Sequence, residues 1–171
     1  MDFSPPLLRE ASSPLPAFPA RFQQLDITKL SAHSDQLSVA GGWDVITAFA
    51  VLHHIPSKEI RLNILSTLHG LLADDGRFIL SNWQFLNSEK LKARIKPWAD
   101  VSIPTSAVDA GDYLLDWRSG GEGLRYVHHF SVAELTQLAH AARFAIRETF
   151  YSDGETGNLG LYQIWEPDST R

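Results

Sequence analysis

Acidic side chains and histidines that border short apolar runs are the residues that could carry chemistry. Asp2 and Asp26 stand near the N-terminus, and a carboxylate there can accept hydrogen bonds from the hydroxyl or amino groups of a ligand. His53 and His54 follow the largely apolar run 45–52 and could act as a base, line a site or bind a metal. Neighbouring residues at the start of a helix point in different directions. We therefore expect packing or site-lining roles for both histidines, and no metal site.

A second group of candidates lies between residues 83 and 129. Arginine can form paired hydrogen bonds to a phosphate or carboxylate of a substrate, and tyrosine and histidine can add to such a site. The alternative is a solvated loop followed by an edge strand. Trp83 could be either a wall of the site or part of the core. The candidates for substrate binding are Trp83, Arg118, Arg125, Tyr126, His128 and His129.

Composition limits the classes of protein that these residues could serve. The 171 residues suffice for one domain, and 44% hydrophobic with 20% charged residues is typical of a globular chain. The absence of cysteine excludes a disulfide framework, a thiolate metal site and a cysteine nucleophile. It also fits a reducing compartment, and we expect a cytoplasmic protein. The net charge of −5 gives no overall basic field for nucleic acid, and no apolar run is long enough to span a membrane.

The middle of the chain predicts a βαβ unit. Residues 43–49 and 76–81 are short apolar runs next to turn residues, which is typical of strands in a parallel sheet. Between them, apolar residues at helical spacing follow Ser57, which we expect to cap the helix. A weaker strand is predicted at 21–25, and loop and turn at 27–37. In such a sheet, ligands bind at the carboxyl ends of the strands.

The C-terminal part predicts a helix and two antiparallel strands. Ser131 and Glu134 form a capping box, in which Ser131 caps the helix and Glu134 reaches back. Residues 144–151 and 159–165 alternate with the period of a strand. The segment 84–130 is too long for a simple connection. We interpret it as a substrate-side insertion in a single domain that spans residues 1–171.

Four segments together resemble the class I S-adenosylmethionine (SAM) methyltransferases. The segment 43–56, read WDVITAFAVLHHIP, resembles their fourth-strand motif, and 71–81 resembles their fifth. The segments 2–4 and 25–27 resemble the ends of their second and third strands. The resemblance implies an α/β Rossmann-like sheet with helices on both faces and SAM as cofactor. It also implies that Asp2 receives the ribose hydroxyls and Asp26 the adenine amino group. The cofactor-binding residues that it implies are Asp2, Phe3, Asp26, Ile27, Ala48, Phe49 and His53.

A narrower resemblance concerns the acceptor of the methyl group. Asn82-Trp83, the run 111–117 and the run 125–130 are similar to segments of the tRNA wobble-uridine carboxymethyl methyltransferases. Asp116 stands where that group has a proline. The resemblance implies a modified tRNA uridine or a small-molecule carboxylate as acceptor. A carboxylate is already nucleophilic, so no catalytic base is assigned.

The family's first strand and Gly-rich loop have no counterpart, because no G-x-G-x-x-G occurs in the sequence. We therefore expect an N-terminally truncated domain that binds SAM weakly. The alternative is a non-catalytic remnant that no longer binds SAM. A nicotinamide-dependent dehydrogenase would share the parallel sheet, but the antiparallel strands at the C-terminus count against it.

Overall fold

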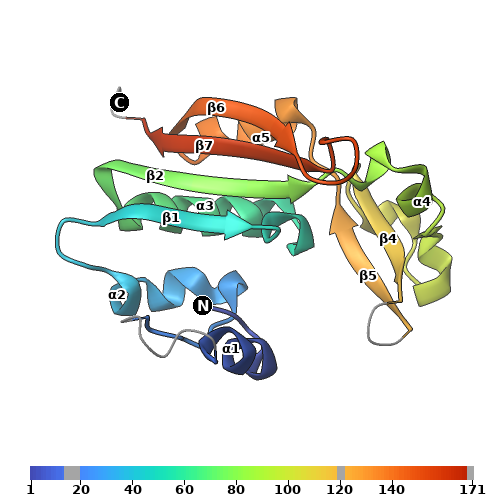
Figure 1. Cartoon of the computed structure of the whole chain (residues 1–171), viewed down its shortest axis with the longest axis horizontal. Coiled ribbons are helices and arrows are strands. Elements are labelled where there is room, and N and C mark those ends of the chain that lie inside the picture. The colour runs from blue at the N-terminus through green and yellow to red at the C-terminus, as the bar shows by residue number, and fades with distance from the viewer. Residues whose placement is uncertain (14–19, 119–121, 169–171) are drawn as a thin grey trace.

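A computed structural model describes residues 1–13, 20–118 and 122–168, and it divides them between two sheets (Figure 1). The α-helices and strands described are α1 (Pro5–Ser12), α2 (Ser34–Leu37), β1 (Trp43–Phe49), α3 (Lys58–Leu71), β2 (Leu72–Trp83), α4 (Glu89–Lys92), β3 (Ile95–Lys96), β4 (Asp112–Trp117), β5 (Gly123–His128), α5 (Val132–Ala141), β6 (Phe144–Ser152) and β7 (Gly160–Pro167). Short 3-10 helices at Ile27–His33, Leu52–His54, Phe85–Asn87, Trp98–Val101 and Thr105–Ala107 lie between them.

The main sheet has the strand order β1-β2-β7-β6. β1 and β2 run parallel, whereas β7 is antiparallel to both β2 and β6. The predicted Rossmann-like α/β sheet with an antiparallel C-terminal pair is thus confirmed. Helices α3 and α5 lie on the same side of this sheet (Figure 1). Beneath them the rings of Phe78, Phe144 and Trp165 pack with centroids 5.4 to 5.8 Å apart.

The opposite face of the sheet carries exposed apolar side chains. Trp43, Val45 and Phe49 of β1 are 43%, 51% and 53% exposed. Alternation along the strand places them on one face, away from the buried Ala48. The helices expected on both faces therefore cover one face in the part of the chain that the structure describes.

The second sheet has the order β3-β4-β5 and falls within the predicted insertion. We call it the cap sheet. Its strands are antiparallel, and its own small core contains Phe85, Leu115 and Val127. Figure 1 shows the cap sheet beyond the carboxyl ends of β1 and β2. This places a separate packed layer at the end of the main sheet where a ligand is expected.

Several local expectations need correction. The segment 27–37, expected as loop and turn, is helical, and 21–25 forms only an isolated parallel bridge between Asp2 and Gln24. Ser57 does not cap α3, because its φ of +68° turns the side chain away and its hydroxyl donates to Glu59. Ser131 does cap α5 by accepting from the Glu134 N–H.

Candidate functional site

A cavity of about 270 Å³ lies where the carboxyl ends of β1 and β2 meet the cap sheet. Its floor comes from the segments after these strands, and its outer wall comes from β4 and β5. The start of β7 and the loop before it close one side. The lining residues are Ala50, His53, His54, Ser81, Asn82, Trp83, Trp117, Arg125, Asp153, Leu159 and Gly160. Of the predicted site residues, His53, Trp83 and Arg125 are brought together here.

Ala50 makes the sharp turn that opens this cavity. Its φ of +55° is in the left-handed region, which costs a non-glycine residue free energy. The turn is held because the Ala50 N–H donates to both the carbonyl oxygen and the hydroxyl of Ser81, at 3.1 Å each. The backbone leaving β1 is thereby fixed to the end of β2, and the 3-10 helix that carries the two histidines follows directly.

His53 is a neutral hydrogen-bond donor toward this site. Its side chain is buried, and burial together with the neighbouring His54 lowers its pKa to about 3. Its Nδ1 accepts a hydrogen bond from the Trp83 N–H at 3.2 Å. A neutral imidazole with Nδ1 as acceptor carries its proton on Nε2. His53 therefore has no free basic nitrogen, and the base role considered from the sequence does not fit its environment.

Asn82 brings a buried amide to the cavity without a hydrogen-bond partner. Its side chain is 1% exposed, and neither Oδ1 nor Nδ2 meets the geometry of a hydrogen bond to any described residue, although the amide lies close enough to His53 to oppose the lowering of the His53 pKa. A buried amide without a partner costs free energy, so such groups often mark binding sites. The sequence draws attention to the pair Asn82-Trp83, but only Trp83 is among the predicted site residues. The position of Asn82 at the end of a central strand is the signal that could have identified it.

Arg125 stacks on Trp117 at the outer wall. Its guanidinium carbon lies 3.5 Å from the centre of the Trp117 ring, which is a cation–π contact. Arg125 has no ion pair with any residue in the described ranges, and burial lowers its pKa. The charge is held in place by the ring while its hydrogen-bond donors stay available for an anion.

The other predicted substrate residues lie elsewhere. Arg118 is exposed and forms an ion pair with Asp116 at 2.6 Å. The Tyr126 hydroxyl and the His128 ring turn away from the cavity into a buried cluster with Asp112. Strand alternation explains the separation, since the side chain of Arg125 projects to one side of β5 whereas those of Tyr126 and His128 project to the other.

The predicted cofactor residues Asp2 and Asp26 lie on adjacent extended segments. Asp2 forms the parallel bridge to Gln24, and its Oδ1 accepts from the Ser4 N–H at 2.7 Å. Asp26 Oδ1 accepts from the hydroxyl and N–H of Thr28, and these hydrogen bonds lower the Asp26 pKa. In both residues Oδ1 is used to orient the carboxylate. Oδ2 of Asp2 therefore remains the oxygen that could meet a ligand, whereas Oδ2 of Asp26 also lies 3.9 Å from the exposed ammonium group of Lys29.

The remaining cofactor predictions divide by exposure. Phe3 is 71% exposed and Phe49 53% exposed, whereas Ala48 is buried. Ile27 packs against the main core. None of these four residues lines the cavity described above. Their roles as cofactor contacts stay predictions. Any such contact would lie beside β1, on the side where the N-terminal segment lies (Figure 1).

Two features bear on partners. Among residues 1–13, 20–118 and 122–168, no helix has both the length and the apolar character needed to cross a bilayer. Within those same ranges no group of three or more histidine or acidic side chains is arranged to hold a metal ion.

A parallel strand pair extended by an antiparallel pair, with a cavity at the carboxyl ends, is the fold of the class I methyltransferases. The chain belongs to the methyltransferase domain family, whose model matches residues 8–149. No curated protein sequence matches the chain.

Solved structures share the fold at low sequence identity. A SAM-dependent methyltransferase from Methanosarcina mazei is 21% identical with a TM-score of 0.67, over 97% of this chain and 79% of that one. One from Clostridium acetobutylicum is 10% identical with a TM-score of 0.67, over 96% and 72%. The Burkholderia thailandensis 1,6-didemethyltoxoflavin-N1-methyltransferase, solved with its substrate and S-adenosylhomocysteine, is 18% identical with a TM-score of 0.54, over 86% and 50%.

Proposed function

We propose that this chain is a SAM-dependent methyltransferase domain that receives its methyl acceptor in the cavity between the main sheet and the cap sheet. The observation that carries the proposal is the convergence of His53, Asn82 and Arg125 at the carboxyl ends of β1 and β2. Together they offer a neutral donor, an unpartnered amide and a cation stacked on tryptophan.

The residues present fit the adenosine part of the cofactor. Asp2 and Asp26 each keep Oδ2 free of protein hydrogen bonds within the described chain, and the ion pair of Asp26 Oδ2 with Lys29 is long, at 3.9 Å. Each carboxylate can therefore accept from a ribose hydroxyl or an adenine amino group. The sulfonium of the bound cofactor supplies an activated methyl group. The protein's task is to align the acceptor with that methyl group and to exclude water.

We assign alignment roles to three residues of the cavity. Arg125 would bind an anionic group of the acceptor, Asn82 would hydrogen-bond to a polar group beside it, and His53 would donate from Nε2. None of these needs to take a proton during the transfer. This suits an acceptor that is already nucleophilic, such as a carboxylate. We propose a carboxylate acceptor, carried by a small molecule or by a modified tRNA uridine.

Calorimetric titration with SAM tests the cofactor part. Asp26→Asn should weaken SAM binding by about tenfold or more, because an ionised acceptor becomes a neutral amide. Asp35→Asn is the matched control, since Asp35 is exposed on α2. Equal weakening by both substitutions would contradict the assigned role of Asp26.

Radiolabelled methyl transfer tests the acceptor part, with a mixture of small carboxylates and with unfractionated tRNA assayed separately. Label in the small carboxylates alone would favour the small-molecule acceptor. Label in tRNA alone would favour the wobble-uridine acceptor.

One observation favours a second candidate, a non-catalytic remnant. In the described part of the chain β1 pairs only with β2, so its outer backbone groups lack a strand partner beside the proposed cofactor site. The sequence also contains no G-x-G-x-x-G loop. No heat of binding with SAM or S-adenosylhomocysteine, in a chain that is folded by circular dichroism, would favour the remnant over the enzyme.

A further inference from the structure

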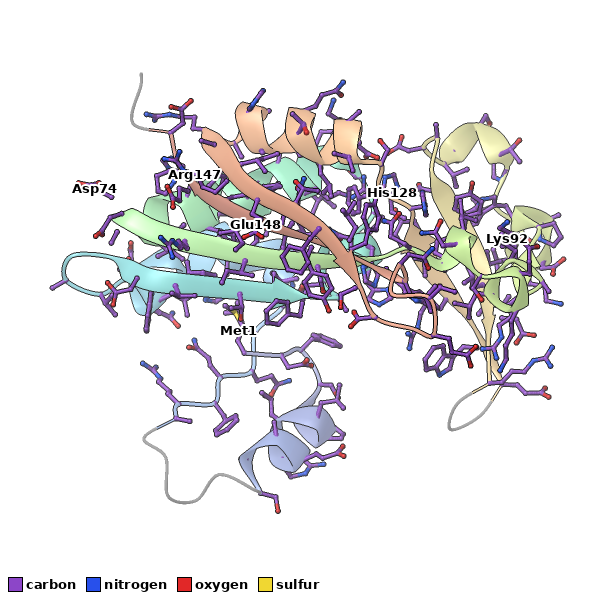
Figure 2. All side chains as sticks on the ribbon, turned by 45° about the horizontal axis from the view of Figure 1, so that its top comes forward. Met1, Asp74, Lys92, His128, Arg147 and Glu148 are labelled. Carbon is purple, nitrogen blue, oxygen red and sulfur yellow. The ribbon has the colours of Figure 1, made fainter. Side chains whose placement is uncertain are left out.

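Five polar side chains from four elements meet in a buried cluster on the far side of β5 from the cavity. Arg61 comes from α3, Asp112 from β4, Tyr126 and His128 from β5, and Glu134 from α5. The side chains of Arg61 and His128 are each 1% exposed, and that of Asp112 is 5% exposed. Figure 2 shows His128 between the main sheet and the cap sheet. We call this group the His128 cluster.

His128 is held at both ring nitrogens by carboxylates. Nδ1 lies 2.5 Å from Asp112 Oδ1, and Nε2 lies 2.8 Å from Glu134 Oε1. An ionised carboxylate only accepts hydrogen bonds, so both nitrogens have to donate, and the ring has to carry both protons. Hydrogen bonds from Tyr126 and His128 lower the Asp112 pKa although burial opposes this, so Asp112 is ionised at neutral pH.

Arg61 completes the cluster and connects it to the cavity floor. Its Nη2 donates to the Tyr126 hydroxyl at 2.8 Å and lies 3.5 Å from Asp112. Its Nε donates to the carbonyl oxygen of Ile55 at 2.8 Å, in the segment that directly follows His53 and His54. With Arg61 and His128 both charged, the two positive charges of the cluster balance the two negative charges of its carboxylates.

The cluster also fixes the strand that carries Arg125. The Tyr126 hydroxyl donates to Asp112 at 2.7 Å, and the Tyr126 carbonyl oxygen lies 3.3 Å from His54 Nδ1. Arg125 is the preceding residue on the same strand and projects into the cavity. A displacement of β5 would therefore move Arg125 and its Trp117 partner relative to the cavity floor.

We infer that doubly protonated His128 is a positioning residue that locks β5 of the cap sheet onto α5, so that Arg125 stands over the cavity. Removing one ring proton leaves a nitrogen lone pair facing a carboxylate, which replaces a strong hydrogen bond with repulsion. Without that proton the lock opens while the main sheet stays folded. The inference rests on the proposed function only where it treats the cavity as the acceptor site.

Other ionisable groups face the cluster and could contribute to its pH dependence. They come from the start of α3, from the turn before β4 and from the end of β5. Those groups are Lys58, Glu59, Asp109 and His129. Burial is the first cause that lowers the pKa of His129 and raises that of Tyr126, so neither becomes charged near neutral pH.

Two measurements on the unmodified chain test the inference without donor or acceptor. Nitrogen NMR of the imidazole rings should show both nitrogens of His128 protonated at neutral pH. Amide protection factors of β5 should fall by about tenfold or more when His128 loses a proton, whereas those of β6 and β7 stay constant. A nitrogen of His128 that is unprotonated at neutral pH would overturn the inference. Equal loss of protection in all three strands would also overturn it.

Variants separate the lock from general stability. His128→Gln should give low protection of β5 at every pH, and Tyr126→Phe should weaken the lock but keep its pH dependence. His129→Gln is the matched control, because His129 is the next residue and lies outside the cluster, packing on Phe85. A pH dependence that survives in His128→Gln would contradict the role of His128. If SAM fails to bind in the calorimetric titration, the proposed function fails while these results still stand.

Discussion

His53 Nδ1 accepts a hydrogen bond from the backbone N–H of Trp83 at 3.2 Å, and this contact joins the ends of two neighbouring parallel strands. The imidazole thereby holds the segments after β1 and β2 together in the floor of the cavity. The hydrogen bond requires the neutral ring, so protonation of His53 would break it. Acid should therefore affect this end of the sheet through His53.

We expect His53 to make the chain less stable in mild acid. Its folded pKa of about 3 lies below the ordinary value of 6.5, so the unfolded chain binds the proton more readily. The contribution is present above pH 6.5 and is lost as the pH falls toward the folded value. Between pH 7 and pH 5 this amounts to about 2 kcal/mol.

Urea unfolding of the wild type and of His53→Gln at pH 7 and pH 5 measures this contribution. The variant should lose about 2 kcal/mol less than the wild type over this range. His140→Gln is the control, because His140 is exposed on α5 and should leave the pH dependence unchanged. Equal pH dependence in wild type and His53→Gln would show that folding does not lower the pKa of His53.

Asn82→Leu should stabilise the chain and impair methyl transfer. Replacing a buried amide that lacks a partner with an apolar side chain of similar size should raise the free energy of unfolding by about 1 kcal/mol. Chemical denaturation measures the gain, and the transfer assay measures the loss. Asn63→Leu, at an exposed position of α3, should change neither. A destabilised Asn82→Leu variant would mean that the amide has a partner in solution.

Arg125→Lys should lower the kcat/KM of methyl transfer to a carboxylate acceptor by about tenfold or more, because lysine cannot stack on Trp117 or form paired hydrogen bonds. SAM affinity should stay unchanged, since Arg125 lies on the acceptor side. Arg118→Lys provides the comparison, as Arg118 is already paired with Asp116 outside the cavity. A larger effect at Arg118 than at Arg125 would restore Arg118 as a substrate residue.

Ser131→Ala should lower the free energy of unfolding by about 1 kcal/mol, because the Ser131 hydroxyl accepts from the Glu134 N–H at the start of α5. Ser57→Ala at the start of α3 should cost only a few tenths of that, since Ser57 makes no capping hydrogen bond. Thermal or urea unfolding distinguishes the two serines. Equal losses would indicate that the position before the helix matters, whatever its hydrogen bond.

Local sequence patterns were sufficient to predict those elements whose conformation depends mainly on neighbouring residues in the sequence. The apolar run 43–49 is a strand with the predicted bounds, and Ser131 caps α5 as predicted. Ser57 had the same sequence signal, but its positive φ depends on how the chain leaves Pro56. Glu134 illustrates the same limit, because it contacts His128 and Arg61 rather than reaching back to Ser131.

The candidate site was harder to predict because its residues come from distant segments. The run 125–129 predicted a single group of polar side chains at a substrate site. The alternation of side chains along β5 instead divides them between the cavity and the buried His128 cluster. Arg61 was overlooked because a charged residue on an amphipathic helix is ordinarily solvated. Only the three-dimensional structure shows that Arg61 is buried and that its side chain reaches Tyr126 of β5.

The uncovered face of β1 affects how the isolated domain can be handled. Among the described residues, no strand pairs with the outer edge of β1. This edge, with the exposed Trp43, Val45 and Phe49 beside it, is a template for sheet extension between molecules. Concentrated samples should therefore self-associate, and a charged substitution such as Val45→Lys should reduce this self-association. The exposed apolar face of β1 is therefore the surface to change when a more soluble form of the chain is needed.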